Sequence, residues 1–138
     1  MIIEKLQSIG VDFADIFASD EFVRGHSFHG KKVLKYSEVQ EKYNDFVIVM
    51  AFAVHDKKML ARVKELSKEH TLYFPNVPVV GDEIFSREYI KEHDSEFDKA
   101  YSLLSDEKSR QSYIDILNFK VSGKTEYLFK CEREKQEI

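Results

Sequence analysis

The chain contains a single cysteine, Cys131, so no disulfide bond can form within it. This cysteine usage suits a reducing compartment, and we expect a cytoplasmic protein. Long apolar runs are also missing, since no stretch approaches the roughly 20 residues that a membrane-spanning helix needs. The first residues, Met1–Lys5, do not join a basic segment to a long apolar one. We therefore expect neither a signal peptide nor a membrane partner.

An excess of positive charge is missing as well. The 138 residues include 21 Lys and Arg against 25 Asp and Glu, which gives a formal net charge of -4. Domains that bind nucleic acid usually carry a basic patch, so we expect no nucleic-acid partner. The composition, with 43% hydrophobic and 33% charged residues, is typical of a folded globular domain. The length is sufficient for one domain with a hydrophobic core.

One continuous apolar run stands out in this charged chain, Phe46–Val54 (FVIVMAFAV). Its length and its Val, Ile and Phe content predict a central strand that is buried on both faces. Asp56 is expected to cap a helix over Lys57–His70, and Thr71–Phe74 is expected to form the next strand. This order of strand, helix and strand predicts an α/β fold with a small parallel sheet.

Further elements are expected upstream of this unit. The patterns predict a helix over Met1–Ile9 and an alternating strand over Val11–Ser19. Glu21–Lys32 is interpreted as a loop, and Ser37 is expected to cap a short helix over Glu38–Tyr43.

From Gly81 onward the chain changes to a helical pattern. The expected elements are a short helix within Phe85–His93, a helix capped by Asp94, a helix capped by Ser105 and ended by Gly123, and a last helix over Glu126–Glu137. We therefore divide the chain into an α/β part over residues 1–80 and a helical extension over residues 81–138. The extension is expected to pack on the α/β part, so that the two form one compact domain.

Candidate ligand contacts follow the ends of the predicted strands. Ligands of open α/β sheets bind beyond the carboxyl ends of the strands, which makes Ala53, His55 and Asp56 the best-placed residues. Asp20 ends an earlier strand, where an acidic residue can hold ribose hydroxyls. The glycine-rich turn that would hold a pyrophosphate does not precede it. The alternatives stay open that Asp20 is a polar strand end and that Asp56 is only a helix cap.

Two other groups of residues carry weaker chemical signals. The motif GHSFHG places His26 and His29 three residues apart, but no third metal ligand with the expected spacing follows, so a solvated loop is favoured over a metal site. Ser109, Ser112 and Cys131 have no neighbouring base with the signature of an activated nucleophile. We therefore expect no catalytic residue and no metal ligand in the chain.

The stretch Leu103–Leu128 (LLSDEKSRQSYIDILNFKVSGKTEYL) carries a recognisable pattern. Its positions are Leu104, Asp106, Glu107, Ser109, Tyr113, Leu117, Gly123, Tyr127 and Leu128. The stretch resembles the linker that precedes the catalytic domain in FkbM-type methyltransferases, which depend on S-adenosylmethionine. Upstream, Asp20, Gly30–Val33 and Phe46–Phe52 match in order the later parts of the Rossmann-like unit of such proteins.

The resemblance implies a truncated Rossmann-like, three-layer unit with a small parallel sheet, followed by a helical extension. It implies that the catalytic domain, with its S-adenosylmethionine site, would begin after Ile138, so no cofactor is expected in this chain. The leading hypothesis is a non-catalytic accessory domain that recognises a substrate or a partner, such as a sugar-containing acceptor. A methyltransferase domain would then be its partner, in cis or in trans.

Two further hypotheses belong to other functional classes. The chain could be a small-ligand module that binds a nucleotide or nucleotide-sugar through Asp20 and the Ala53–Asp56 loop. It could also have a structural role in dimerisation. Relative to the resembling family, the first strand is missing, so Val11–Ser19 and Phe46–Val54 would either pair directly or expose edges that a second copy covers. We therefore expect a homodimer.

Overall fold

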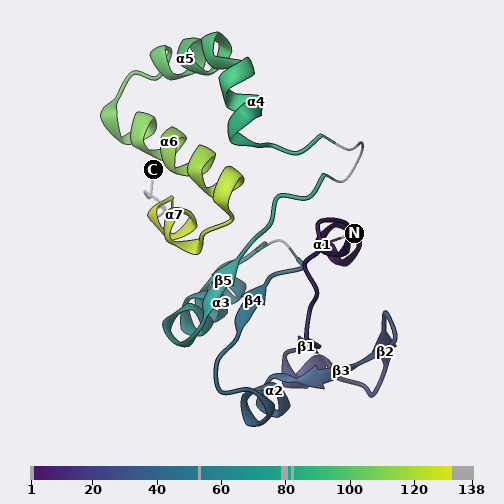
Figure 1. The fold of residues 1–138 in the computed structure, drawn as a ribbon. Coiled ribbons are helices and arrows are strands. Elements are labelled where there is room, and N and C mark those ends of the chain that lie inside the picture. Colours follow the sequence, from purple (N-terminus) through teal and green to yellow (C-terminus); the bar gives the residue numbers. More distant parts are fainter. Residues whose placement is uncertain (1, 53, 79–80, 82, 132–138) are drawn as a thin grey trace. The chain divides into compact units, whose positions relative to one another are not determined.

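The computed structural model describes residues 2–52, 54–78, 81 and 83–131 (Figure 1). The fold is mixed α/β, as predicted, and it divides into two compact units, Met1–Phe46 and Val47–Ile138. Each unit has its own small sheet. The predicted boundary lay after residue 80, whereas the observed one follows Phe46. The predicted strand–helix–strand segment therefore shares a unit with the helices that follow it.

The first unit is built around a three-stranded sheet with the order β1-β3-β2. Its elements are α1 (Ile2–Ser8), β1 (Ile16–Ala18), the 3-10 helix η1 (Asp20–Phe22), β2 (Ser27–Phe28), β3 (Lys31–Lys35) and α2 (Tyr36–Lys42). β1 runs parallel to β3, whereas β2 runs antiparallel to it. The buried residues of this unit are Val33 of β3 and Val39 of α2, which form its small core.

Three predictions for this unit need correction. β1 covers only part of the predicted strand Val11–Ser19, because only its last residues are in register with β3. The predicted loop Glu21–Lys32 contains η1, β2 and the start of β3. Ser37 lies inside the first turn of α2 rather than capping it, since the N-cap position belongs to Lys35.

The motif GHSFHG forms a β-hairpin. Phe28 of β2 pairs with Lys31 of β3, which leaves His29 and Gly30 as a two-residue turn. Both turn residues have positive φ angles, 48° and 74°, as a type I′ hairpin turn requires. A tight hairpin turn therefore accounts for the positive φ angles at His29 and Gly30, and the prediction of a loop is corrected to a hairpin here.

A carboxylate ties the start of β1 to the end of α2. The Oδ2 atom of Asp15 accepts hydrogen bonds from Lys42 Nζ (2.7 Å) and from the Tyr43 hydroxyl (2.6 Å). The bond from Lys42, followed by the bond from Tyr43, holds the pKa of the Asp15 carboxyl below its ordinary value. The ionised form is therefore the one that the folded unit favours.

Asp15→Asn is expected to lower the free energy of unfolding by about 1 kcal/mol at neutral pH, because it replaces charge-assisted hydrogen bonds by weaker ones. Since folding depresses the pKa, this stabilisation is present above the unfolded pKa of about 4 and is lost as the pH falls through the folded value. Urea unfolding at neutral and acidic pH measures both effects. Asp45→Asn, at an exposed position, is the control. Equal losses in the two variants would contradict the assignment.

The second unit starts with a parallel two-stranded sheet. Its elements are β4 (Val47–Val49), α3 (Lys57–Glu69), β5 (Thr71–Tyr73), α4 (Arg87–Glu92), α5 (Asp94–Ser102), α6 (Glu107–Ser122) and α7 (Thr125–Lys130). The predicted strand, helix and strand are confirmed, and β4 and β5 are parallel. The N-cap of α3 is also confirmed, because Asp56 Oδ1 accepts a hydrogen bond from the backbone N–H of Met59 (2.8 Å).

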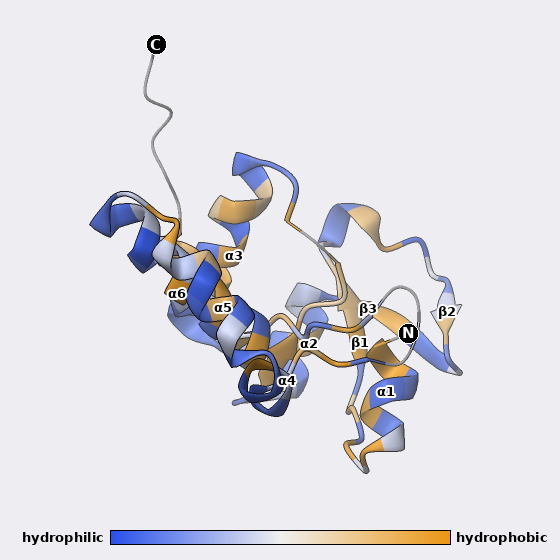
Figure 2. Cartoon of the chain, turned by 90° about the horizontal axis from the view of Figure 1, so that it is seen from above, coloured by the Kyte–Doolittle hydropathy of each residue, from blue (hydrophilic) through white to orange (hydrophobic). Residues whose placement is uncertain are grey.

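The prediction that Phe46–Val54 is buried on both faces is wrong. β4 is short, and burial alternates along it: Ile48 is buried, whereas Val47 is 59% and Val49 is 38% exposed. Ile48 is in register with Leu72 of β5, which is buried as well. Met50 and the buried apolar residues of α3 supply the rest of this core, and Figure 2 shows apolar and polar segments alternating along that helix. The sheet therefore buries one face.

The prediction of a single parallel sheet is also wrong for the described strands. β1 pairs with β3, and β4 pairs with β5, so the strands within Val11–Ser19 and Phe46–Val54 belong to different sheets. The first sheet is mixed, because the hairpin adds β2 antiparallel to β3. The direct pairing that the sequence left open is accordingly not observed.

The helices of this region are those that the sequence predicted, but Asp94 is the first residue of α5 and not its N-cap, which is His93. α6 starts one residue later than expected, because Asp106 rather than Ser105 is its N-cap: the Asp106 carboxylate accepts hydrogen bonds from the backbone N–H (2.8 Å) and the hydroxyl (2.6 Å) of Ser109. Gly123 ends α6 as predicted, with φ at 67°. α7 covers the first part of the predicted last helix, and residues 132–137 lie outside the described residues.

The turn between α6 and α7 joins the helices to β5. The backbone N–H of Phe74 donates to the Gly123 carbonyl (2.8 Å), and Tyr73 forms an antiparallel bridge with Lys124. The rings of Phe74 and Phe119 also lie 6.0 Å apart. The helical region therefore packs on the β4–α3–β5 segment of the same unit. In the described part of the chain, no helix has the length and apolar character that crossing a membrane requires.

Candidate functional site

Asp20 holds the first turn of α2. Its Oδ1 atom accepts a hydrogen bond from the backbone N–H of Tyr36 (2.9 Å), and its Oδ2 atom accepts one from the Ser37 hydroxyl (3.0 Å). The residue follows β1 directly, so it connects the end of that strand to the helix. This geometry agrees with the alternative that Asp20 is a polar residue at the end of a strand. The role of Asp20 as a ribose ligand stays a prediction.

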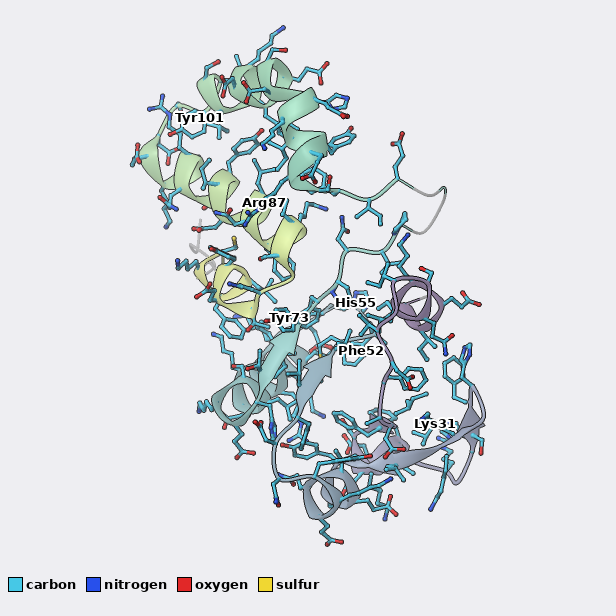
Figure 3. The ribbon with its side chains drawn as sticks, in the orientation of Figure 1. Lys31, Phe52, His55, Tyr73, Arg87 and Tyr101 are labelled. Carbon is cyan, nitrogen blue, oxygen red and sulfur yellow. The ribbon has the colours of Figure 1, made fainter. Side chains whose placement is uncertain are left out.

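The other predicted site residues belong to the second unit. Ala53 lies outside the described residues. His55 is exposed, and Figure 3 shows it with Phe52 beyond the carboxyl end of β4. Asp56 caps α3 as described above. Asp20 belongs to the first unit, whereas His55 and Asp56 belong to the second, so a ligand site that combines them stays a prediction.

A cavity of about 470 Å3 lies elsewhere in the second unit, along β5 and the α6–α7 turn. We call it the β5 groove. It is lined by Ser67, Lys68, Glu69, His70, Thr71, Leu72, Tyr73, Lys124, Thr125 and Glu126. The end of α3 and all of β5 therefore form one wall, and the start of α7 forms the other.

The sequence builds this groove with a close approach of two backbones. Gly123 adopts a left-handed conformation that turns the chain back from α6 toward β5. A Cβ atom at this position would lie 2.7 Å from the carbonyl oxygen of Phe74, so only glycine fits. The turn then places Lys124 opposite Tyr73, and α7 starts at the next residue.

The chemistry of the groove is polar and balanced in charge. The lining includes two lysines, Lys68 and Lys124, and two glutamates, Glu69 and Glu126. The hydroxyl-bearing side chains are Ser67, Thr71, Tyr73 and Thr125. Hydroxyls donate and accept hydrogen bonds, and carboxylates accept them, which suits a ligand that itself carries many hydroxyl groups. Equal numbers of positive and negative groups favour a neutral ligand over a highly charged one.

The side chain of His70, which lines the groove, is 10% exposed. Its Nε2 atom lies 3.9 Å from a carboxylate oxygen of Glu69. Lys68 is held at the rim by Glu65, at 2.7 Å. Lys68 is therefore positioned by a neighbour in the same helix.

Sequence reasoning did not find this groove. Tyr73 and Lys124 are far apart in the chain, and neither belongs to a motif with a chemical spacing. The sequence predicted the end of a helix at Gly123 and a strand over Thr71–Phe74, but it gave no sign that the two lie side by side. Local patterns of this kind predict each element but not which elements lie side by side.

Comparison with known proteins gives no relative for this chain. No family model, curated protein or solved structure matches it. Within the described residues, no three His, Cys, Asp or Glu side chains gather where they could hold a metal ion. The candidate site is therefore defined by its own geometry.

Proposed function

We propose that the chain is a non-catalytic accessory domain that recognises a neutral, sugar-containing part of the substrate of an FkbM-type methyltransferase. The β5 groove is the observation that carries this proposal. Its volume of about 470 Å3 lies within the range of small-molecule sites in proteins. Its hydroxyl groups and balanced charges match the hydrogen-bonding surface of a saccharide better than that of a phosphate-bearing ligand.

The link to methyltransferases rests on the residues of Leu103–Leu128. This stretch contains α6, the Gly123 turn and the first residues of α7, and so it supplies one wall of the groove. The parallel segment β4–α3–β5, which supplies the other wall, has the order of a Rossmann-like unit. We therefore propose that a Rossmann-like segment and the linker-like helices together form the recognition site.

Neutral mono- and disaccharides are expected to bind the chain saturably in calorimetric titrations. Glu126→Gln should weaken that binding about tenfold, because a carboxylate is a stronger acceptor for sugar hydroxyls than an amide. Glu96→Gln is the matched control, since Glu96 also lies in the first turn of a helix, α5, but outside the groove. An unchanged affinity in Glu126→Gln would contradict the proposed site.

The same titration separates an accessory domain from a catalytic one. S-adenosylmethionine should give no binding heat with this chain, because the resemblance assigns the cofactor to a separate catalytic domain. Saturable binding accompanied by methyl transfer would contradict the non-catalytic role.

A homodimer is the second candidate, and the β4 strand favours it. β4 has one partner, β5, among the described strands, and the side chains of Val47 and Val49 are exposed. An open edge with apolar side chains can pair with the same edge of a second copy. Sedimentation at high micromolar concentration should then show a dimer that Val49→Lys dissociates. A monomeric wild-type chain would contradict this candidate.

A further inference from the structure

We infer that a second, smaller cavity of this unit binds a phosphate-type oxyanion. The cavity has a volume of about 160 Å3 and lies among α4, the C-terminal half of α6 and the start of α7. Its polar lining consists of Arg87, Asn118, Ser122, Lys124 and Tyr127. Nothing in the proposed saccharide recognition requires it, although Lys124 lines both the β5 groove and this cavity.

The charge of the lining has one sign. Arg87 and Lys124 are its charged residues, and no carboxylate belongs to it. Within the described residues, neither side chain forms an ion pair. Arg87 interacts electrostatically with its neighbour Glu88, which does not line the cavity. Both residues are exposed, which leaves the cavity open to an ion from solution. A negative ligand would relieve the repulsion between the two cations.

The two cations come from different elements and converge on one place. Arg87 is the first residue of α4, and Figure 3 shows it beside α6. Lys124 is held by the turn after α6, because its backbone N–H donates to the Ser122 hydroxyl (3.2 Å), which in turn donates to the Asn118 carbonyl (2.6 Å). The turn that shapes the β5 groove therefore also places Lys124 at the small cavity.

Neutral donors and apolar walls complete the site. The side chains of Asn118 and Tyr127 each carry a donor that can reach an oxyanion in the cavity lining. Leu117 and Val121 supply apolar surface, which strengthens the attraction between a bound anion and the cations. The planar guanidinium of Arg87 can donate two parallel hydrogen bonds, a geometry that phosphate oxygens match.

Inorganic phosphate, titrated at constant ionic strength into the full chain, tests this site. Saturable NMR shifts are expected at the backbone amides of Asn118, Lys124 and Tyr127. Arg87→Gln and Lys124→Gln should each weaken phosphate binding about tenfold. Lys120→Gln is the matched control, because Lys120 lies on α6 outside the cavity lining and removes the same charge. Melting temperatures of all variants should stay close to that of the wild type, because these side chains are exposed.

The absence of saturable shifts would overturn the inference, as would equal weakening by Lys120→Gln, which would indicate general electrostatic attraction. Glucose 1-phosphate distinguishes the source of the phosphate group. Tighter binding than inorganic phosphate, reduced by Glu126→Gln, identifies a phosphorylated sugar that spans both cavities. Equal affinities for the two probes identify free phosphate. Failure of neutral saccharides to bind would contradict the proposed function and leave the oxyanion site standing.

Discussion

Gly123→Ala is expected to lower the free energy of unfolding by about 3 kcal/mol. Gly123 has a φ angle of 67°, and an L-residue in this left-handed region loses roughly 1–2 kcal/mol. The added Cβ would also lie 2.7 Å from the Phe74 carbonyl oxygen and 3.0 Å from its carbonyl carbon. Such overpacking against backbone costs about another 1–3 kcal/mol, since the strand or the turn must shift. Urea unfolding measures the sum of the conformational cost and the overpacking cost.

Gly81→Ala is the matched control for this prediction. Gly81 has a φ angle of 77°, but nothing lies within 4 Å of its added Cβ. Its substitution should therefore cost only the conformational part, about 1 kcal/mol. Equal losses in the two variants would show that the close approach of Gly123 to Phe74 does not stabilise the unit. The difference between the variants reports on the contact that shapes the β5 groove.

Leu72→Ala is expected to lower the free energy of unfolding by about 3 kcal/mol as well. Leu72 is the central residue of β5 and is 3% exposed. It is in register with Ile48, which is also 3% exposed, so its removal leaves a cavity in the core of the sheet. Buried Leu→Ala changes cost about 2–5 kcal/mol, depending on how far the surroundings relax.

Leu103→Ala makes the same chemical change at a position that is 76% exposed. Its effect on stability should stay within about 0.5 kcal/mol, as for most surface substitutions. Chemical unfolding of both variants tests the assignment of the core. A loss in Leu103→Ala as large as in Leu72→Ala would mean that Leu103 is covered in solution.

The local features of this fold could be read from the sequence. Asp56 and Gly123 were assigned as the start and end of helices because capping depends on a few neighbouring residues. The assignment of Ser105 as a cap was off by one residue, because Asp106 also has a side chain that can accept from the first turn. Such errors are small, since both residues satisfy the same local rule.

The long-range features could not be read in this way. The apolar run Phe46–Val54 indicated a strand correctly, but its burial depends on how many strands and helices cover it. The observed sheet has two strands, which leaves Val47 and Val49 exposed. The pairing of β1 with β3 was likewise missed, because Lys31–Lys35 carries too many charges to stand out as a strand.

The two candidate cavities could not be predicted from the sequence for the same reason. Both need Lys124 next to residues that are distant in the chain, Tyr73 in one case and Arg87 in the other. None of these three residues has a motif around it that indicates a ligand. Their proximity follows from the Gly123 turn and from the packing of α6, which only the folded chain defines.

The most direct test of the account is an NMR titration of the chain with a neutral disaccharide. The proposal predicts saturable shifts in the backbone amides of Thr71, Tyr73 and Thr125, which line the β5 groove. Glu126→Gln should require about tenfold more ligand for the same shifts, whereas Glu96→Gln should behave as the wild type. Saturable shifts confined to residues outside the groove, or no shifts at all, would contradict the assignment of this groove as the recognition site.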